Sequence, residues 1–277
     1  MSPDEYCRRV AAQSNSSFYY SFFLLPPDRR KAIVALYAYC RELDDIVDIG
    51  ADIAQAQGKL DEWRHEISAM MQGRATHPIT RALFPHLETC AITQEYLHAL
   101  IDGMQMDLCQ YSYPDFTSLA RYCWHVASVV GILSARIFGA IHPQSVQYAE
   151  KLGLAFQMTN IIRDVGEDAA RGRIYLPADD MAHFGVTQDD IMNRRTTSSF
   201  KELLRFQAKR THALYAEAQA IIPPTDKKKL RPALAMTGIY HALLHKMERS
   251  GFPVLTQRVS LNPVKKLRLA WRAYRSD

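Results

Sequence analysis

Two segments of the sequence place acids and polar partners at spacings that could bind a metal ion and an anion. Each segment carries two aspartates four residues apart, preceded by two further polar side chains at helical intervals. The first set is Tyr37, Arg41, Asp44 and Asp48, and the second set is Gln157, Asn160, Asp164 and Asp168. Residues three, four or seven apart lie on one face of a helix. Each set borders an apolar stripe, so both faces should point inward.

Two aspartate pairs that face each other across a helical bundle could share Mg²⁺, a hard cation that prefers oxygen ligands. Arg41 and Arg163 accompany the acids, and guanidinium groups fork onto phosphate oxygens. Spacing alone is a weak signal, because about 1.2 Asp-x-x-x-Asp pairs are expected by chance among 18 aspartates, and three occur. An internal salt-bridge network without a metal is the alternative interpretation.

Helices must position these residues, because helical periodicity dominates the chain. Glycine is scarce and no segment alternates at period two, which disfavours a β fold. We predict one all-α domain over residues 1–277 with a central apolar cavity. Long helices are expected at about 26–49, 52–73, 93–108, 117–139, 143–166, 199–222 and 226–250, with irregular structure at 169–195. Pro232 could kink the last of these helices.

The helix that ends at Gly139 could line a tunnel for a long apolar tail. Plain core packing explains its side chains equally well. These side chains are Val126, Val129, Val130, Leu133 and Ile137, around the small Gly131.

The composition excludes several classes of protein. No G-x-G-x-x-G or G-K-[ST] loop occurs, so a Rossmann or P-loop nucleotide site has no support. Five scattered cysteines without a C-x-x-C pair exclude a disulfide scaffold and suit a reducing, intracellular compartment. The polar N-terminus does not resemble a signal peptide. The apolar stretch 124–141 contains Arg136, which favours a core helix over a membrane span.

Positive charge is concentrated at the C-terminal end. The net charge is +5, and residues 253–277 carry six cations and one acid, which accounts for all of it. A nucleic-acid partner is therefore not expected. Residues 262–275 mix apolar and basic side chains, so this tail could lie on an anionic membrane or dock as a terminal helix. We predict a cytoplasmic protein, with peripheral contact to the inner face of the membrane as the open alternative.

Two long motifs carry a resemblance to a known family. YAYCRELDDIVD at 37–48 and QMTNIIRDVGED at 157–168, followed by RGRIYLP at 171–177, resemble the squalene/phytoene synthases. These are head-to-head prenyl-diphosphate synthases with the all-α isoprenoid synthase fold. The resemblance runs from Ser14 to about Gly251. Residues 16–20 and 22–26 most resemble the hopanoid-pathway branch, the presqualene diphosphate synthases.

The resemblance implies a role for each polar residue of the motifs. The metal-binding positions are Asp44, Asp48, Asp164 and Asp168, with Asn160 assisting. The diphosphate-binding arginines are Arg41, Arg163 and Arg173. The residues that contact diphosphates or shape the reaction centre are Ser17, Tyr37, Gln157 and Tyr240. The family resemblance implies about three Mg²⁺ ions per site and no NADPH for the first half-reaction.

The implied reaction joins two farnesyl diphosphates into presqualene diphosphate and pyrophosphate, feeding squalene and hopanoid synthesis, with a downstream enzyme of that pathway as a conceivable partner. The same motifs could serve a phytoene synthase acting on geranylgeranyl diphosphate, or a squalene or dehydrosqualene synthase. Two alternatives from other classes stay open. Glu62-x-x-His65 and Glu95-x-x-His98 could belong to a di-iron carboxylate bundle, and a relative of the same fold could be a non-catalytic scaffold.

Overall fold

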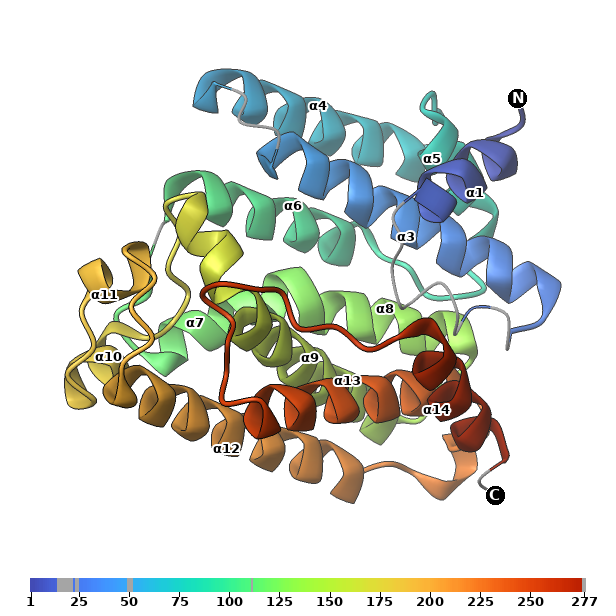
Figure 1. Cartoon of the computed structure of the whole chain (residues 1–277). Helices are drawn as coiled ribbons and strands as arrows, with labels where there is room; N and C mark the ends of the chain where they lie inside the picture. The colour runs from blue at the N-terminus through green and yellow to red at the C-terminus, as the bar shows by residue number, and fades with distance from the viewer. Residues whose placement is uncertain (14–21, 23–24, 49–51, 111, 276–277) are drawn as a thin grey trace.

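Helices form all of the regular secondary structure in the described part of the chain, apart from one isolated bridge between Ser112 and Ile174. The computed structural model describes residues 1–13, 22, 25–48, 52–110 and 112–275 (Figure 1). The prediction of an all-α fold is confirmed. The helices are α1 (Pro3–Gln13), α3 (Pro27–Asp48), α4 (Ile53–Met71), α5 (Pro78–Leu83), α6 (Gln94–Cys109), α7 (Phe116–Cys123), α8 (Val129–Phe138), α9 (Pro143–Ala170), α10 (Ala178–His183), α11 (Gln188–Met192), α12 (Ser198–Ala220), α13 (Arg231–Arg249) and α14 (Pro263–Arg275).

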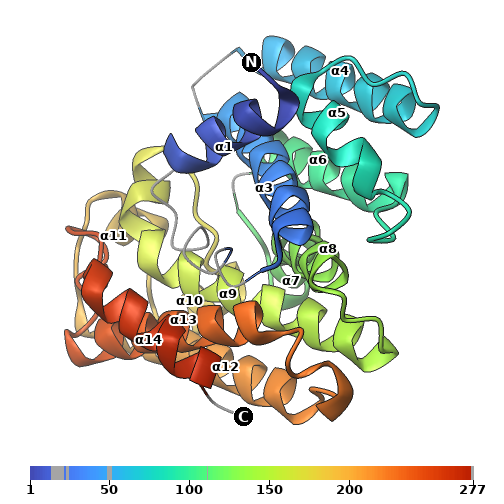
Figure 2. The ribbon, with the colours of Figure 1, turned by 90° about the vertical axis from the view of Figure 1, so that its right-hand side faces the viewer.

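The long helix α9 lies at the centre of the bundle. It packs against α8 and against α12 and α13, and Figures 1 and 2 both place it between this lower pair and α3 above. One apolar core surrounds α9, α12 and α13. A second core joins α3, α4 and α6. This arrangement puts the two helices with the acidic motifs, α3 and α9, on opposite sides of one interior space.

The structure corrects several of the expected helix boundaries. The helix predicted at 117–139 is divided into α7 and α8 by a π-helical turn at Trp124–Ser128. There, the Ser128 hydroxyl donates to the carbonyl of Glu150 on α9, at 2.8 Å. The irregular region contains α10 and α11. Pro232 does not kink a helix, because α13 begins at Arg231 and a proline in the first turn removes no intrahelical hydrogen bond.

Two further predictions from the sequence concern a di-iron site and a membrane-spanning helix. Glu62, His65 and Glu95 are exposed, so they do not provide the inward ligand set that a di-iron bundle needs. Among the described residues, no helix combines the length and the apolar character needed to cross a membrane.

Candidate active site

A cavity of about 530 Å³ opens between α3, α6, α8, α9 and α13. This volume lies within the range of about 300–1,000 Å³ that small-molecule sites occupy. Along both α3 and α9 the lining changes from apolar to charged in the N-to-C direction. On α3 it runs from Ile33 to Asp44, and on α9 from Tyr148 to Asp168. Asp164 lies sixteen residues after Tyr148, which corresponds to about 24 Å along the helix, so the cavity is a long slot with one charged end.

The charged ends of α3 and α9 lie close together in space. The Arg173 guanidinium, just after α9, donates to the carbonyl of Val47 near the end of α3, at 3.2 Å. Asp44, Asp164 and Asp168 all line the cavity. The structure therefore brings three of the four predicted metal-binding aspartates together. Asp48 is the last residue of α3, but its side chain lies outside the described residues, as does the whole of Ser17.

The charged end has the properties of a site for a divalent cation. Burial raises the pKa of the Asp168 carboxyl to about 7, and the charge of Asp164 adds to this shift. Within the described structure, the buried Oδ1 atom of Asn160 has no hydrogen-bond partner. The raised pKa of Asp168 beside Asp164, together with the unpaired amide oxygen of Asn160, indicates an oxygen-rich donor set that a bound cation would stabilise. The residues present thus fit Mg²⁺.

Arginines surround the same end of the cavity. Arg163 forks onto Asp164, with its Nε atom 2.7 Å from Oδ1, and both side chains are mostly buried. Arg41 pairs with Asp45 on the exposed side of α3. Both arginines and Arg173 line the cavity. Several cations beside carboxylates form a surface that could receive a polyanion bridged by metal ions.

The remaining predicted residues are arranged around this group. Tyr37 and Gln157 line the cavity, and the Asn160 amide nitrogen donates to the Gln157 side chain at 3.3 Å. Tyr240 is not among the lining residues but is buried directly behind them. Burial raises the pKa of Tyr240, whereas the Arg163 charge and a hydrogen bond with Asn160 oppose this shift. Tyr240 therefore supports two polar residues of the site from α13.

Sequence reasoning missed Asp107, a buried acid that α6 contributes to the cavity wall. The Tyr122 and Tyr175 hydroxyls donate to its two carboxylate oxygens at 2.9 and 2.7 Å. The cluster fixes both rings at the cavity surface. A signal was present in the sequence, because Asp107 lies between Met104 and Leu108 on the apolar face of its helix, where an acid is costly unless it is paired.

Arg258 was also missed, because it lies outside both motifs. It follows α13 and reaches back to α9, with Nε 3.3 Å from an Asp164 oxygen and Nη1 3.5 Å from Glu167. Buried apolar side chains before and after it, from Val254 to Leu261, anchor this segment. Figure 1 shows the segment running from the end of α13 across the bundle to α14. The C-terminal part of the chain thus contributes a cation to the charged end of the cavity.

The absence of a side chain at Gly166 lets this segment approach α9. The amide of Gly166 donates to the carbonyl of Val254, at 3.2 Å. A Cβ atom at Gly166 would lie 2.6 Å from the carbonyl oxygens of Val254 and Leu255, closer than packed atoms allow. The position of Arg258 therefore depends on a glycine of α9 that is distant from this segment in sequence but contacts it in space.

We expect Gly166→Ala to displace this segment and reduce turnover by roughly tenfold or more, because small misplacements of binding groups are costly in catalysis. Steady-state kinetics on the substrates that the motif resemblance implies would measure the loss. Gly238→Ala on α13 is the matched control, since a Cβ atom there would meet no atom within 4 Å and alanine favours a helix by about 1 kcal/mol. Equal activity in both variants would contradict the dependence on Gly166.

The apolar half of the cavity differs in part from the predicted tunnel. Val126, Val130 and Gly131 line it, as expected. The other predicted residues, Val129, Leu133 and Ile137, are buried in the core with α3 and α6. These spacings would place the predicted residues on one side of a regular helix, but the π-helical turn at Trp124–Ser128 interrupts the helix before α8. Ser134 and Phe138 take their place in the lining, so the wall is formed by the neighbouring side of the same helix, one residue further along.

Comparison with known proteins agrees with this fold. The model of the squalene/phytoene synthase family matches residues 11–265, and the chain belongs to this family. It is 34% identical to the phytoene synthase of Arthrospira platensis, over 95% of this chain and 89% of that protein. It is 34% identical to phytoene synthase 2 of Oryza sativa subsp. japonica, over 94% of this chain and 67% of that protein.

The solved structures that are similar to this chain carry the names of two other synthases. The squalene synthase HpnC from Alicyclobacillus acidocaldarius superposes with a TM-score of 0.80 at 30% identity, covering 90% of this chain and 94% of that one. A dehydrosqualene synthase in complex with a ligand superposes with a TM-score of 0.86 at 26% identity, covering 98% and 95%. The family that the motifs predict is confirmed. The relatives of the chain, however, are named as three different synthases: phytoene, squalene and dehydrosqualene synthase.

Proposed function

We propose that the protein condenses two farnesyl diphosphates head to head, giving presqualene diphosphate and pyrophosphate. The observation that supports this proposal is the polarity of the cavity. Acids and arginines gather where α3 and α9 end, and apolar side chains line the slot behind them. Such a slot suits a substrate with an anionic head and a long hydrocarbon tail. The choice of the C15 substrate rests on the resemblance of residues 16–26 to the hopanoid branch.

Asp44, Asp48, Asp164 and Asp168 would hold Mg²⁺, assisted by Asn160. When bound, the cation supplies Lewis-acid stabilisation of the charge on the diphosphate. Arg163 and Arg173 would bind the same diphosphate through their fixed guanidinium forks. Arg41 and Arg258 extend this positive surface toward solvent, since each is about half exposed. These preformed cations favour departure of the diphosphate because the negative charge grows on it as the bond breaks.

Departure of one diphosphate leaves an allylic cation on the donor farnesyl chain. The C2–C3 double bond of the acceptor attacks C1 of this cation, and loss of one proton closes a cyclopropane ring. The products are presqualene diphosphate, pyrophosphate and a proton. Tyr37 and Phe22 meet edge to face in the lining, with ring centroids 5.9 Å apart. Aromatic walls of this kind exclude water and stabilise a nearby cation.

Incubation with farnesyl diphosphate and Mg²⁺, without NADPH, should accumulate presqualene diphosphate. Product analysis by mass spectrometry and measurement of pyrophosphate release would check this result. A parallel incubation with geranylgeranyl diphosphate tests the second candidate, phytoene synthase, which the 34% identity to named phytoene synthases favours. Preferential turnover of the C20 substrate would replace the first proposal by the second. No pyrophosphate from either substrate would instead favour a non-catalytic scaffold.

We further propose that α14 contacts an anionic membrane surface. Val264, Leu267 and Trp271 recur along one side of this helix and are 75%, 52% and 61% exposed, while Ala270 is buried and the helix packs on α13. Three cations of the helix lie beside this apolar strip: Lys265, Arg268 and Arg272. An exposed apolar strip beside cations suits the interface of an anionic bilayer.

Vesicles that contain phosphatidylglycerol should sediment the full-length protein and retain less of a Leu267→Ser, Trp271→Ser double variant. We expect the apparent partition coefficient to fall by about tenfold, since each buried apolar side chain contributes about 1.5–3 kcal/mol at full burial and less at an interface. Neutral vesicles and high salt are the matched controls for the basic residues. Equal sedimentation of both proteins would show that α14 is not the contact.

A further inference from the structure

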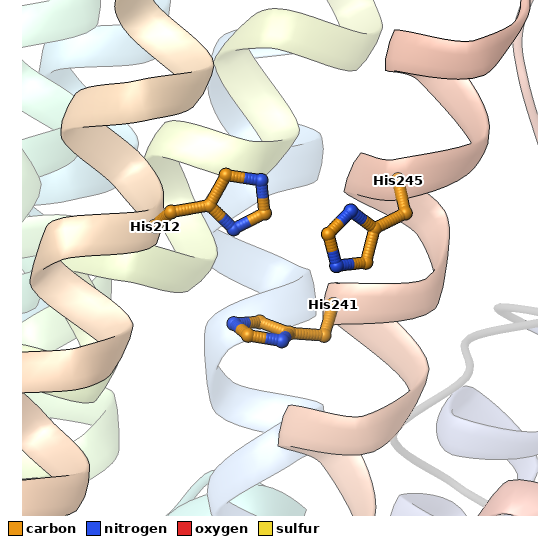
Figure 3. A group of neighbouring side chains, drawn as sticks. All are labelled: His212, His241 and His245. Carbon is orange, nitrogen blue, oxygen red and sulfur yellow. The ribbon is translucent and has the colours of Figure 1, made fainter.

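Three histidines gather between α12 and α13, away from the cavity. His212 comes from α12, and His241 and His245 lie one turn apart on α13 (Figure 3). One ring nitrogen of each lies within 4.8 Å of the others. None of the three lines the cavity described above. Two histidines four residues apart on a helix, with a third from a neighbouring helix, form a spacing that can chelate one transition-metal ion.

His241 carries the strongest sign that this cluster lacks a ligand. Its Nε2 atom is buried and has no hydrogen-bond partner within the described structure, although buried polar atoms are almost always paired. Burial lowers the pKa of His241, and the charges of His212 and His245 lower it further.

Glu248 adds an oxygen donor beside two of the three histidines. One of its carboxylate oxygens, Oε2, lies 3.1 Å from Nε2 of His212 and 3.0 Å from Nδ1 of His245. Bonds of about 2.0–2.1 Å to a tetrahedral zinc ion place neighbouring donors roughly 3.3 Å apart. The His245 side chain is 55% exposed, so it can shift toward the other two histidines to close the group, and it leaves a route for the ion to enter.

We propose that His212, His241 and His245 bind one Zn²⁺ ion, with Glu248 as the fourth ligand. Imidazole nitrogen with a single carboxylate is a donor set that suits zinc and disfavours magnesium. The site is thus chemically distinct from the aspartate-rich cavity. Because its ligands come from two helices, the bound ion would cross-link α12 to α13, and α13 also carries Tyr240 beside the polar end of the cavity.

Titration of the untagged full-length protein with Co²⁺ and Zn²⁺, in saturating Mg²⁺, would test this site. Co²⁺ should give the intense visible absorption of a four-coordinate ion, and Zn²⁺ should displace it with one ion per chain. At a hundredfold excess of Zn²⁺ over its dissociation constant, we expect the melting temperature to rise by roughly 5 °C. Catalytic activity is not needed for any of these readouts, so failure of the proposed synthase reaction would leave this test unaffected.

Variants distinguish Zn²⁺ binding at the histidines from Zn²⁺ binding at the aspartates of the cavity. His245→Asn and His241→Asn should each weaken Zn²⁺ binding by at least about 100-fold, and Glu248→Gln by about tenfold. His65→Asn, at an exposed histidine on α4, is the matched control and should bind as the parent does. Because His245 is exposed, its variant should fold normally, which circular dichroism would check. Equal binding by parent and His245→Asn, or parent affinity weaker than roughly 100 µM, would overturn the proposal and leave a metal-free Glu–His hydrogen-bond network.

Discussion

Replacing Asp44 by asparagine should reduce pyrophosphate release from farnesyl diphosphate by roughly 10²–10³-fold, because a preorganised group that stabilises developing charge contributes about this much to the rate. Asp44 lines the charged end of the cavity opposite Asp164. The amide keeps the shape of the carboxylate but loses its charge, so affinity for Mg²⁺ should fall with turnover. Raising the Mg²⁺ concentration should therefore restore part of the activity.

Asp28→Asn makes the same chemical change on the same helix and is the matched control. Asp28 is exposed in the first turn of α3, away from the cavity. Turnover by this control should stay within about twofold of the parent, while its stability falls by about 0.3–1 kcal/mol through the helix dipole. Near-parent turnover by Asp44→Asn at limiting Mg²⁺ would refute the metal-binding role of Asp44.

The largest expected loss of stability comes from Asp226, which is only 2% exposed. Its carboxylate accepts hydrogen bonds from the His142 amide at 2.9 Å and the Ser145 hydroxyl at 2.8 Å, and pairs with Lys229 at 2.9 Å. It thereby ties the start of α9 to the turn before α13. Asp226→Ala leaves buried donors without an acceptor, and should lower the free energy of unfolding by about 2–4 kcal/mol.

The pH dependence follows from the same contacts. Burial acts to raise the pKa of Asp226, but hydrogen bonds from His142, Lys229 and Ser145 outweigh it and lower the pKa to about 2. A carboxyl whose pKa is lower in the folded state stabilises the fold above its unfolded pKa of about 3.9 and loses this effect as the pH falls toward 2. Urea unfolding of parent and variant at several pH values from neutral to 4 should show a constant difference that shrinks only at lower pH.

Asp189→Ala is the control for the comparison of Asp226→Ala with the parent protein. Asp189 is an exposed acid near the start of α11, and its removal should change the unfolding free energy by no more than about 1 kcal/mol. A loss for Asp226→Ala that matched this control would mean that the buried contacts contribute little to stability.

The sequence alone determined the helical class, the family and most of the polar site. Helical spacing is a local property, so the position of Asp44 relative to Arg41, and of Asp164 relative to Asn160, could be read without coordinates. The same holds for α9, whose apolar stripe borders its polar one. Where local geometry was interrupted, prediction failed: the π-helical turn at Trp124–Ser128 depends on close packing against α9, and it rotates the helix face that reaches the cavity.

Only the tertiary structure decided which distant residues join the site. Asp107 on α6 and Arg258 after α13 carry no motif, and they reach the cavity because α9 brings their segments together. The histidine cluster is of the same kind, since His212 and His241 meet only through the packing of α12 against α13. Spacing along a chain fixes neighbours within one helix, whereas contacts between helices depend on how whole faces pack, which no local pattern specifies.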